Sequence, residues 1–472
     1  MATIVTHELI NLLQTLISID STPENGNLEC AVFLKDWFED LGFKCRLLED
    51  QYNGRPQANL IAMLGNPGEK HLALLNHLDT VSAGDTALWT ETNNNPFASS
   101  VRDGYIYGLG SADSKGGMAS KMLAIKRLIK SGWEGHFYVV GTYGEEMGLQ
   151  GATHISKENV RAEYVMVGEP TRLAYVRANK GYMIYELKAI DEISAPIHMQ
   201  VTEAMRLRFR GKASHSSTPQ RGVNAVLKCC DVLRTLRNAD PELHLYQVTG
   251  GISHNVVPAA CDMTLKTKLD LRSFSWSQDI DIENVTVTCA PISLSFEKRM
   301  QFYLNELMVI AHTFKANVYP GFDPAYTTLS IGQLEMDSQA LRIVWDVRPH
   351  PGMRLCELQT LFNGFREHCL TSALVCEINE KRSVEAFDLA PDHNFIQFLQ
   401  LIDEKPCDVK SGCTEASVLV QNGFIPVVHG PGLATGNIHR PNECCSVAEL
   451  VEAVYFYEKL LLICATTDGV RA

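Results

Sequence analysis

The sequence contains no long apolar run and no cluster of basic residues. No window approaches the roughly 18 uncharged apolar residues that a membrane-spanning helix needs. Residues 1–20 lack a basic flank followed by an apolar core, so we expect no secretory signal. The formal net charge of −13 argues against nucleic acid or an anionic membrane as the main partner. We therefore expect a soluble protein that binds a small molecule.

The sequence also lacks any Cys-x-x-Cys motif, although it has 14 cysteines. Two pairs are adjacent, Cys229-Cys230 and Cys444-Cys445, and adjacent cysteines rarely form a disulfide without strain. Reduced thiols are the rule in the cytoplasm. We expect free thiols and a cytoplasmic location.

Three common catalytic signatures are missing as well. There is no Gly-x-Ser-x-Gly elbow and no His-Glu-x-x-His helix. Gly108-Leu109-Gly110 lacks the third glycine of a dinucleotide-binding fingerprint. These absences disfavour a serine hydrolase of the elbow type, a helix-based zinc protease and a nicotinamide-dependent oxidoreductase.

The length and the hydrophobic pattern predict two domains. The chain has 472 residues, of which 45% are hydrophobic and 21% are charged, and this length exceeds one ordinary core. Residues 1–181 alternate between strand-like and helix-like segments, which predicts a layered α/β domain with a mostly parallel sheet. Residues 182–376 predict a smaller α+β insertion. Residues 377–472 again show the alternating pattern of residues 1–181 and are expected to complete the first domain.

Periodicity predicts the individual elements. Apolar residues at helical spacing predict helices at 6–18, 31–41, 118–129, 224–236, 300–314 and 447–464. Short apolar or alternating runs predict strands at 59–64, 72–75, 137–141, 164–167, 182–189, 205–210, 243–271, 285–296 and 341–347.

Five short segments with carboxylates or histidines are the most informative part of the sequence. They are Asn76-His77-Leu78-Asp79, Gly110-Ser111-Ala112-Asp113, Gly144-Glu145-Glu146, Gly168-Glu169-Pro170-Thr171 and Gly436-Asn437-Ile438-His439. Imidazole and carboxylate are the ligands that zinc and similar divalent ions prefer. An acidic residue at the end of a buried strand meets a large desolvation cost, which a metal offsets. Together the segments predict a two-metal hydrolase, although any one of them alone is more often a surface feature.

The spacing within the segments suggests which residues ligate metal, which orient a ligand and which transfer protons. His77 and Asp79 lie two residues apart, so on a strand they point the same way. The Asp79 carboxylate can then hold one imidazole nitrogen while the other binds metal. Glu145 and Glu146 are consecutive and cannot both face one way, so one can ligate a metal while the other moves protons.

Longer stretches resemble a known family. They are HLDTV (77–81), YGLGSADSKGGMAS (107–120), GEEMGLQGA (144–152), VGEPT (167–171), VRANKG (176–181), GKASHSSTPQRGVNA (211–225), GCTEAS (412–417) and HGPG (429–432). They resemble the zinc-dependent aminoacylases and deacylases, which include acetylornithine deacetylase, succinyl-diaminopimelate desuccinylase and carboxypeptidase G. The resemblance looks strongest to acetylornithine deacetylase. It covers about 1–240 and 325–472.

The resemblance implies a role for each site residue. One metal would be held by His77, Asp113 and Glu169, and a second by Asp113, Glu146 and His439, so that Asp113 bridges them. Glu145 would be the general base, Asp79 would orient the site, and His215 would stabilise the oxyanion from the opposite subunit. Asn255 and Arg348 would recognise the substrate. The implied cofactors are two zinc ions, with cobalt as the alternative.

The insertion departs from the family pattern. The match to the family is poor over residues 188–204 and 273–320. The second of these segments separates two Asp-x-Arg motifs, Asp270-Leu271-Arg272 and Asp346-Val347-Arg348. The repeat indicates either an internal duplication or chance, and either arginine could contact the substrate, with Arg348 preferred.

The resemblance predicts hydrolysis of N-acetylornithine to ornithine and acetate, a step of arginine biosynthesis. The alternatives are a succinyl-diaminopimelate desuccinylase, another N-acyl amino acid deacylase or a dipeptidase, and, from a different class, an inactive relative that serves as a binding protein. The insertion would act as a lid and dimerisation domain, which predicts a homodimer. A monomer in which the extra segments replace the partner is the other possibility.

Overall fold

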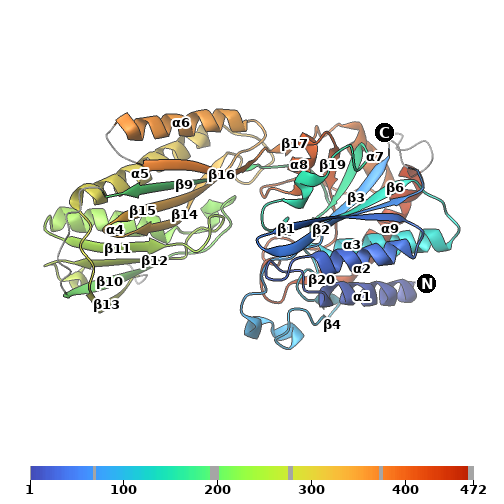
Figure 1. Ribbon diagram of the computed structural model, residues 1–472, viewed down its shortest axis with the longest axis horizontal. Coiled ribbons are helices and arrows are strands. Elements are labelled where there is room, and N and C mark those ends of the chain that lie inside the picture. Colours follow the sequence, from blue (N-terminus) through green and yellow to red (C-terminus); the bar gives the residue numbers. More distant parts are fainter. Residues whose placement is uncertain (1, 67–70, 192–200, 275–279, 372–375, 466–472) are drawn as a thin grey trace. The chain divides into compact units, whose positions relative to one another are not determined.

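The computed structural model describes residues 2–66, 71–191, 201–274, 280–371 and 376–465 (Figure 1). The chain forms two compact units. Unit 1 comprises Met1–Ala178, Phe387–Val409 and Thr414–Ala472, and unit 2 comprises Asn179–Ala386 and Lys410–Cys413. The insertion extends past its expected end at residue 376, because β16 (Cys376–Val384) pairs with β9 (Tyr182–Ile190) inside unit 2.

Unit 1 is built on a nine-stranded sheet in the order β1-β2-β6-β3-β7-β19-β8-β17, with β18 paired to β8. Its strands are β1 (Lys44–Tyr52), β2 (Arg55–Leu64), β3 (Leu72–His77), β6 (Phe137–Thr142), β7 (Tyr164–Gly168), β8 (Tyr175–Asn179), β17 (Phe387–Asp388), β18 (Cys407–Lys410) and β19 (Ile425–Val428). The neighbours β6, β3, β7 and β19 are parallel, whereas β1, β2 and β8 pair antiparallel. The α/β class is therefore confirmed, and the parallel arrangement holds at the centre of the sheet.

Strand β1 was not expected from the sequence. It forms a hairpin with β2 across Asn53 and Gly54, whose φ angles are 51° and 72°. Asn-Gly favours this left-handed two-residue turn, because both positions tolerate positive φ. The alternating exposed and half-buried residues of β1 are typical of an edge strand.

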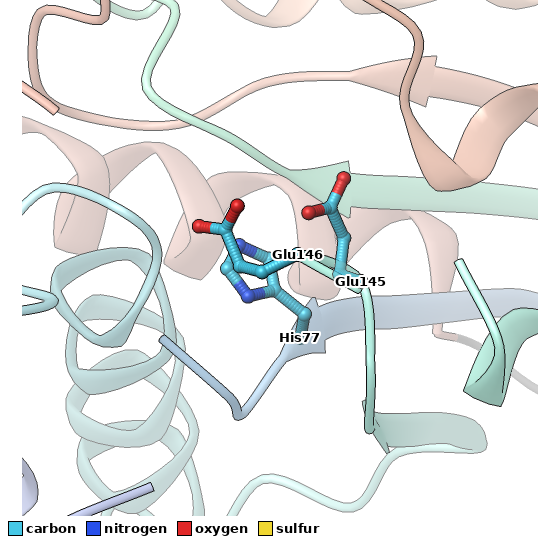
Figure 2. Close-up of side chains that lie close together, drawn as sticks. All are labelled: His77, Glu145 and Glu146. Atoms are coloured by element: carbon cyan, nitrogen blue, oxygen red, sulfur yellow. The ribbon is translucent and has the colours of Figure 1, made fainter. Parts of the chain in front are cut away.

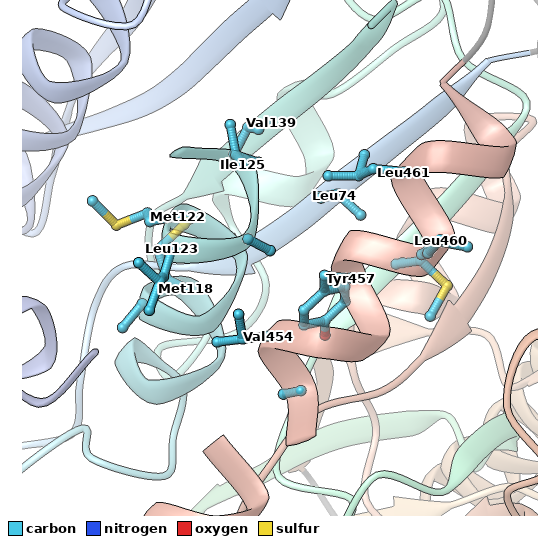
Figure 3. Close-up of a cluster of buried hydrophobic side chains, with 14 of the residues drawn as sticks. Leu74, Met118, Met122, Leu123, Ile125, Val139, Val454, Tyr457, Leu460 and Leu461 are labelled. Atoms are coloured by element: carbon cyan, nitrogen blue, oxygen red, sulfur yellow. The ribbon is translucent and has the colours of Figure 1, made fainter. Parts of the chain in front are cut away.

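Helices cover both faces of the central strands in unit 1. They are α1 (Ala2–Ser18), α2 (Leu28–Glu39), α3 (Lys115–Lys130), α7 (Asn394–Ile402), α8 (Glu415–Gln421) and α9 (Val447–Cys464). Figure 3 shows Leu74 of β3 among side chains of α3 and α9, such as Met122 and Leu461. Ala73 and Leu75 point to the opposite face, which packs beneath α8. Burial on both faces explains the continuous apolar runs of these strands.

A small three-stranded sheet joins two distant loops of unit 1. Its order is β20-β5-β4, with β4 (Ser100–Arg102), β5 (Tyr105–Tyr107) and β20 (Cys444–Ser446). Cys444 pairs with Tyr107, so the segment that follows His439 lies beside the segment that leads to Asp113. Two candidate metal ligands more than 300 positions apart are thereby held near one another.

Unit 2 contains an eight-stranded antiparallel sheet in the order β13-β10-β12-β11-β14-β15-β9-β16. Its further elements are β10 (Thr202–Arg210), α4 (Ala225–Ala239), β11 (His244–Gly250), β12 (Ala260–Lys266), β13 (Ile280–Val287), α5 (Leu294–Thr313), β14 (Thr328–Met336), β15 (Ala340–Arg348) and α6 (Leu355–Thr371). Side chains of α4, α5 and α6 form one core with the sheet.

The sheet of unit 2 consists of two halves with the same strand order. The inserted half comprises β10, α4, β11, β12 and β13, and the outer half comprises β9, α5, β14, β15, α6 and β16. The strands of each half can be numbered from one to four along the chain. From the central pair β11–β14 outward, both halves then follow the order two, three, one, four. The repeated order favours internal duplication over chance.

The inserted half accounts for the two segments in which the match to the family is poor. Residues 188–204 enter the inserted half, and residues 273–320 leave it through β13 and α5. Parts of both, 192–200 and 275–279, lie outside the described residues. The strand expected at 285–296 is wrong beyond residue 287, because Ser293 caps the start of α5 through its side chain.

Short 3₁₀ turns complete the described structure. They are η1 (Thr86–Leu88), η2 (Thr90–Thr92), η3 (Gly151–His154), η4 (Pro219–Arg221), η5 (Leu271–Ser273) and η6 (Phe314–Ala316). Among the described helices, none combines the length and the hydrophobicity that crossing a membrane requires.

Candidate metal centre

Three neighbouring parallel strands of unit 1 deliver candidate ligands to one edge of the sheet. His77 is the last residue of β3, Glu145 and Glu146 follow β6, and Glu169 follows β7 directly. These strands lie in the order β6-β3-β7, so their carboxyl ends meet. Functional groups of α/β proteins collect at this edge, because the loops that follow the strands converge there.

Asp113 lies between two histidines. Its Oδ1 is 3.0 Å from Nε2 of His77, and its Oδ2 is 3.3 Å from Nε2 of His439. The same His439 nitrogen is 2.9 Å from Oε1 of Glu146. One carboxylate therefore offers an oxygen to each of two imidazoles, which is the arrangement expected of a ligand that bridges two ions.

The ligand atoms form compact groups. Oxygen and nitrogen atoms lie within 4.8 Å of one another in His77–Asp113–Glu169 and in Asp113–Glu146–His439. These are the two sets that the sequence resemblance implies. Two imidazoles with several carboxylates also match the donor chemistry of zinc and related divalent ions.

A third group, His77–Glu145–Glu146, meets the same distance limit, so Glu145 is also within reach of a metal. Figure 2 shows that the side chains of Glu145 and Glu146 leave the backbone in different directions beside His77. The two consecutive carboxylates are thus separated in space, as their adjacency in the sequence requires.

Asp79 makes a different contact from the one expected. The Nδ1 atom of His77 is 3.0 Å from the backbone oxygen of Asp79, and the Asp79 carboxylate is 3.8 Å away. That carboxylate instead accepts hydrogen bonds from the backbone N–H groups of Glu145 and Glu146, at 3.2 and 3.1 Å. The chain turns after β3, so the atom that orients His77 is the carbonyl oxygen of Asp79. The Asp79 carboxylate instead positions the loop that carries Glu145 and Glu146.

Electrostatics of the bare site favour a bound cation. Burial alone would lower the pKa of His77 and raise that of Asp113. The Asp113 carboxylate instead raises the pKa of His77, and the two imidazoles of His439 and His77 lower the pKa of Asp113. The pKa of His439 rises to about 11, because Glu146 and Asp113 outweigh its burial. The imidazoles therefore hold protons where a metal ion would bind. A divalent cation in this position supplies the positive charge instead and releases those protons.

Glu145 is a carboxylate of the centre whose pKa is raised. Burial raises its pKa well above the ordinary value, and the negative charges of Glu169 and Glu146 raise it further. A carboxylate whose pKa is raised accepts protons more readily at neutral pH, which is the property that a general base needs.

A chain of buried polar side chains, which sequence reasoning did not assign to the site, supports the backbone of His77. Nζ of Lys121 donates to Oδ1 of Asn76 at 2.6 Å, and Nδ2 of Asn76 donates to Oγ of Ser114 at 3.0 Å. The Ser114 hydroxyl donates to the carbonyl oxygen of His77 at 3.1 Å. Gly168 is required here, because a Cβ at that position would lie 2.0 Å from Nδ2 of Asn76. A lysine between the apolar residues Met118, Met122 and Ile125 of the predicted helix was the available sequence signal.

The loop that carries His439 is held by the side chain of Asn437. Nδ2 of Asn437 donates to the carbonyl oxygens of Leu433 and Cys444 at 2.9 and 2.8 Å. His439 itself has a φ of 59°, in the left-handed region. Non-glycine residues are kept in this region where the surroundings hold them, and such positions cluster at functional sites.

The other candidate residues belong to unit 2. The segment with His215 pairs with the segment of Asn255 through a bridge between His215 and Val256 and a bond from Ser216 N–H to the Asn255 carbonyl. Oγ of Ser216 donates to Oδ2 of Asp346 at 3.0 Å. His215 and Asn255 of the inserted half are thereby linked to Asp346 of the outer half.

The two Asp-x-Arg motifs differ in structure. Nε and Nη2 of Arg348 donate to the two carboxylate oxygens of Asp346, both at 2.8 Å, and this pair is buried. Asp270 instead caps the short η5 turn by accepting from the backbone of Arg272, and the Arg272 side chain is exposed. The arginine fixed within the polar cluster is therefore Arg348.

Comparisons with known proteins agree with this geometry. Residues 73–463 match the model of the family described as Peptidase family M20/M25/M40. Among solved structures, aminoacylhistidine dipeptidase from Vibrio alginolyticus is similar with a TM-score of 0.64 at 15% identity, over 96% of both chains. Human carnosine dipeptidase 1 is similar with a TM-score of 0.57 at 13% identity, over 98% of this chain and 97% of the other.

An M20 family metallo-carboxypeptidase from Sulfolobus solfataricus is similar with a TM-score of 0.56 at 16% identity, over 96% of this chain and 98% of the other. At such identities the three likenesses concern the fold, whereas the family match spans most of the sequence. The chain belongs to peptidase family M20/M25/M40 and is a metal-dependent hydrolase.

Proposed function

We propose that this chain is a two-zinc amidohydrolase that removes the acyl group from an N-acyl amino acid, with N-acetylornithine as the first candidate substrate. The observation that carries the proposal is Asp113, whose two carboxylate oxygens face the imidazoles of His77 and His439. When bound, two divalent ions supply Lewis acidity and lower the pKa of a shared water towards about 7.

The residues of the chain provide the proton transfers. Glu145 takes the proton of the attacking water and delivers it to the leaving nitrogen, and its raised pKa suits both steps. Asp79 keeps Glu145 in place by accepting from its backbone N–H.

His215 is the proposed donor to the oxyanion. Its Nδ1 accepts a hydrogen bond from the backbone N–H of Ser217 at 3.1 Å. With Nδ1 as the acceptor, the remaining ring proton is on Nε2, and this tautomer can donate to a developing negative charge. Removing one such donor typically costs about 2.7–4 kcal/mol of transition-state stabilisation.

The substrate class is tested by a kinetic screen. We expect kcat/KM to be highest for N-acetylornithine among acetylornithine, succinyl-diaminopimelate, acetylcitrulline and a set of dipeptides. The motifs VGEPT, VRANKG and GCTEAS support the deacetylase hypothesis, because they resemble segments of acetylornithine deacetylase. A dipeptidase is the second candidate, supported by the similarity in fold to aminoacylhistidine dipeptidase. A preference for dipeptides would replace the first candidate by the second. No amide hydrolysis together with no bound metal would favour a binding protein.

Zinc is the proposed metal, because a small site of imidazole and carboxylate ligands suits it well. Cobalt is the alternative, since sites of this composition accept several divalent ions. Elemental analysis of protein purified without chelators identifies the ion.

We further propose that one chain completes its own site. The homodimer expected from the resemblance stays a prediction, and the duplicated sheet supports the other possibility. In the dimeric arrangement His215 would come from a second subunit. Here His215 lies in the inserted half, and Ser216 next to it donates to Asp346 of the outer half of the same chain. This contact between the two halves of unit 2 supports the proposal of a monomer.

This arrangement predicts a monomer of 52.4 kDa by light scattering and no complementation between inactive variants. Cells that co-express Glu145→Ala and His215→Ala chains should show no more activity than either variant alone. If His215 acted across a dimer, mixed dimers would contain one intact site and restore about a quarter of wild-type activity. Restored activity would contradict the monomer.

A further inference from the structure

Glu443 is a buried carboxylate beneath the loop that carries Asp113. Its Oε1 accepts from the backbone N–H groups of Ala112 and Asp113 at 2.8 and 3.0 Å, and its Oε2 accepts from Gly110 N–H at 3.2 Å. Only 1% of the residue is exposed. Three converging backbone N–H groups form a concave anion site, here filled by a side chain of the same unit.

This carboxylate is held by backbone dipoles. Among the described residues Glu443 forms no ion pair, and a buried carboxylate without hydrogen bonds would be costly. The three N–H groups meet that cost only while the loop keeps its present conformation. The side chain and the loop therefore fix one another.

Glu443 also belongs to the segment that carries the second histidine. It lies four residues after His439, and its own carbonyl oxygen accepts from Gly108 N–H at 3.0 Å. The adjacent Cys444 pairs with Tyr107 in the small sheet. One residue thus connects the loop of Asp113 to the loop of His439.

We propose that Glu443 is a positioning residue that sets the spacing of the two metal sites, and that it does so by fixing the backbone from which Asp113 projects. The proposal rests on the metal centre described above. If the backbone at residues 110–113 shifts, the two Asp113 oxygens can no longer face both imidazoles. The ion held by Asp113, Glu146 and His439 depends on both connected loops, so it is the one that weakens first.

The test is zinc titration of metal-free protein in competition with a chromophoric chelator, with no substrate present. Glu443→Gln keeps the side-chain volume but turns one acceptor oxygen into an NH₂ donor that faces backbone N–H groups. We expect zinc affinity at the weaker site to fall about 10–100-fold, as for other residues that orient metal ligands. With zinc at saturation, kcat should fall while KM for the substrate stays close to the wild-type value.

Glu458→Gln is the matched control. Glu458 is a partly buried glutamate of unit 1 that pairs with Arg127 on α3. It should leave zinc affinity unchanged. Glu443→Asp keeps the charge but withdraws it by one methylene, so it should lose less affinity than Glu443→Gln.

Glu443→Gln that binds two zinc ions as tightly as wild type would overturn the proposal, even if its melting temperature fell. If Glu443→Gln does not fold, Glu443→Asp decides, and unchanged zinc affinity in that variant would overturn the proposal as well. If wild-type protein takes up no zinc, the metal centre itself is refuted. Failure of the Glu443 proposal can therefore be distinguished from failure of the proposed function.

Discussion

Replacing Glu145 by alanine is expected to lower kcat by about 10²–10⁴-fold, the usual contribution of acid–base catalysis, while both metal ions stay bound. The reason is that His77, Asp113, Glu146, Glu169 and His439 form two complete ligand groups without Glu145. The proton of the attacking water then has no acceptor at the place where the raised pKa of Glu145 provides one. The measurements are kcat on the best substrate of the screen and zinc content by elemental analysis.

Glu158→Ala is the control, because Glu158 is an exposed glutamate of the same unit. It should leave both quantities unchanged. Two results for Glu145→Ala would contradict the assignment. A near-normal rate would show that another group takes the proton. Loss of zinc would show that Glu145 is a ligand, as its proximity to His77 and Glu146 allows.

The ligands of the metal centre could be predicted from the sequence because of a rule of parallel sheets. His77, Glu145, Glu146 and Glu169 all stand at or just after the ends of apolar runs that could only be buried strands. The carboxyl ends of neighbouring parallel strands meet at one edge, so groups far apart in the chain converge. His439 follows no such strand. Its residue type grouped it with the other candidate ligands, and only the family resemblance assigned it to a particular metal.

The supporting contacts could not be predicted in the same way. Glu443 binds three N–H groups of a loop more than 300 residues earlier, and Asp79 turns its carboxylate towards the Glu145–Glu146 backbone. Both contacts depend on the path of loops, which has no periodicity in the sequence. A buried carboxylate close after a metal-binding histidine is the signal that could have directed attention to Glu443.

The duplicated sheet of unit 2 was visible in the sequence as a weak repeat of Asp-x-Arg. The repeat alone was ambiguous, because Asp270 and Arg272 form a local cap whereas Asp346 and Arg348 form a buried pair. The decisive information is the strand order, which follows from pairing between residues far apart in the chain. Each half places its own first strand between its third and fourth, an arrangement that no local pattern encodes.

Asp113→Ala is expected to lose both metal ions, whereas His439→Ala is expected to lose one. Asp113 supplies an oxygen to each ligand group, so its removal leaves His77 with Glu169 at one position and His439 with Glu146 at the other. Catalytic zinc sites generally need about three protein ligands, and two carboxylate or imidazole groups rarely retain the ion.

His439→Ala provides the contrast, because it leaves the group of His77, Asp113 and Glu169 intact. After dialysis, zinc content should be about two ions per chain in wild type, about one in His439→Ala and near zero in Asp113→Ala, as the ligand counts require. Circular dichroism of each variant establishes that the fold is retained. One tightly bound ion in Asp113→Ala would mean that the two positions are independent. Asp113 would then be a ligand of one ion, and the argument for a shared water would lose its structural basis.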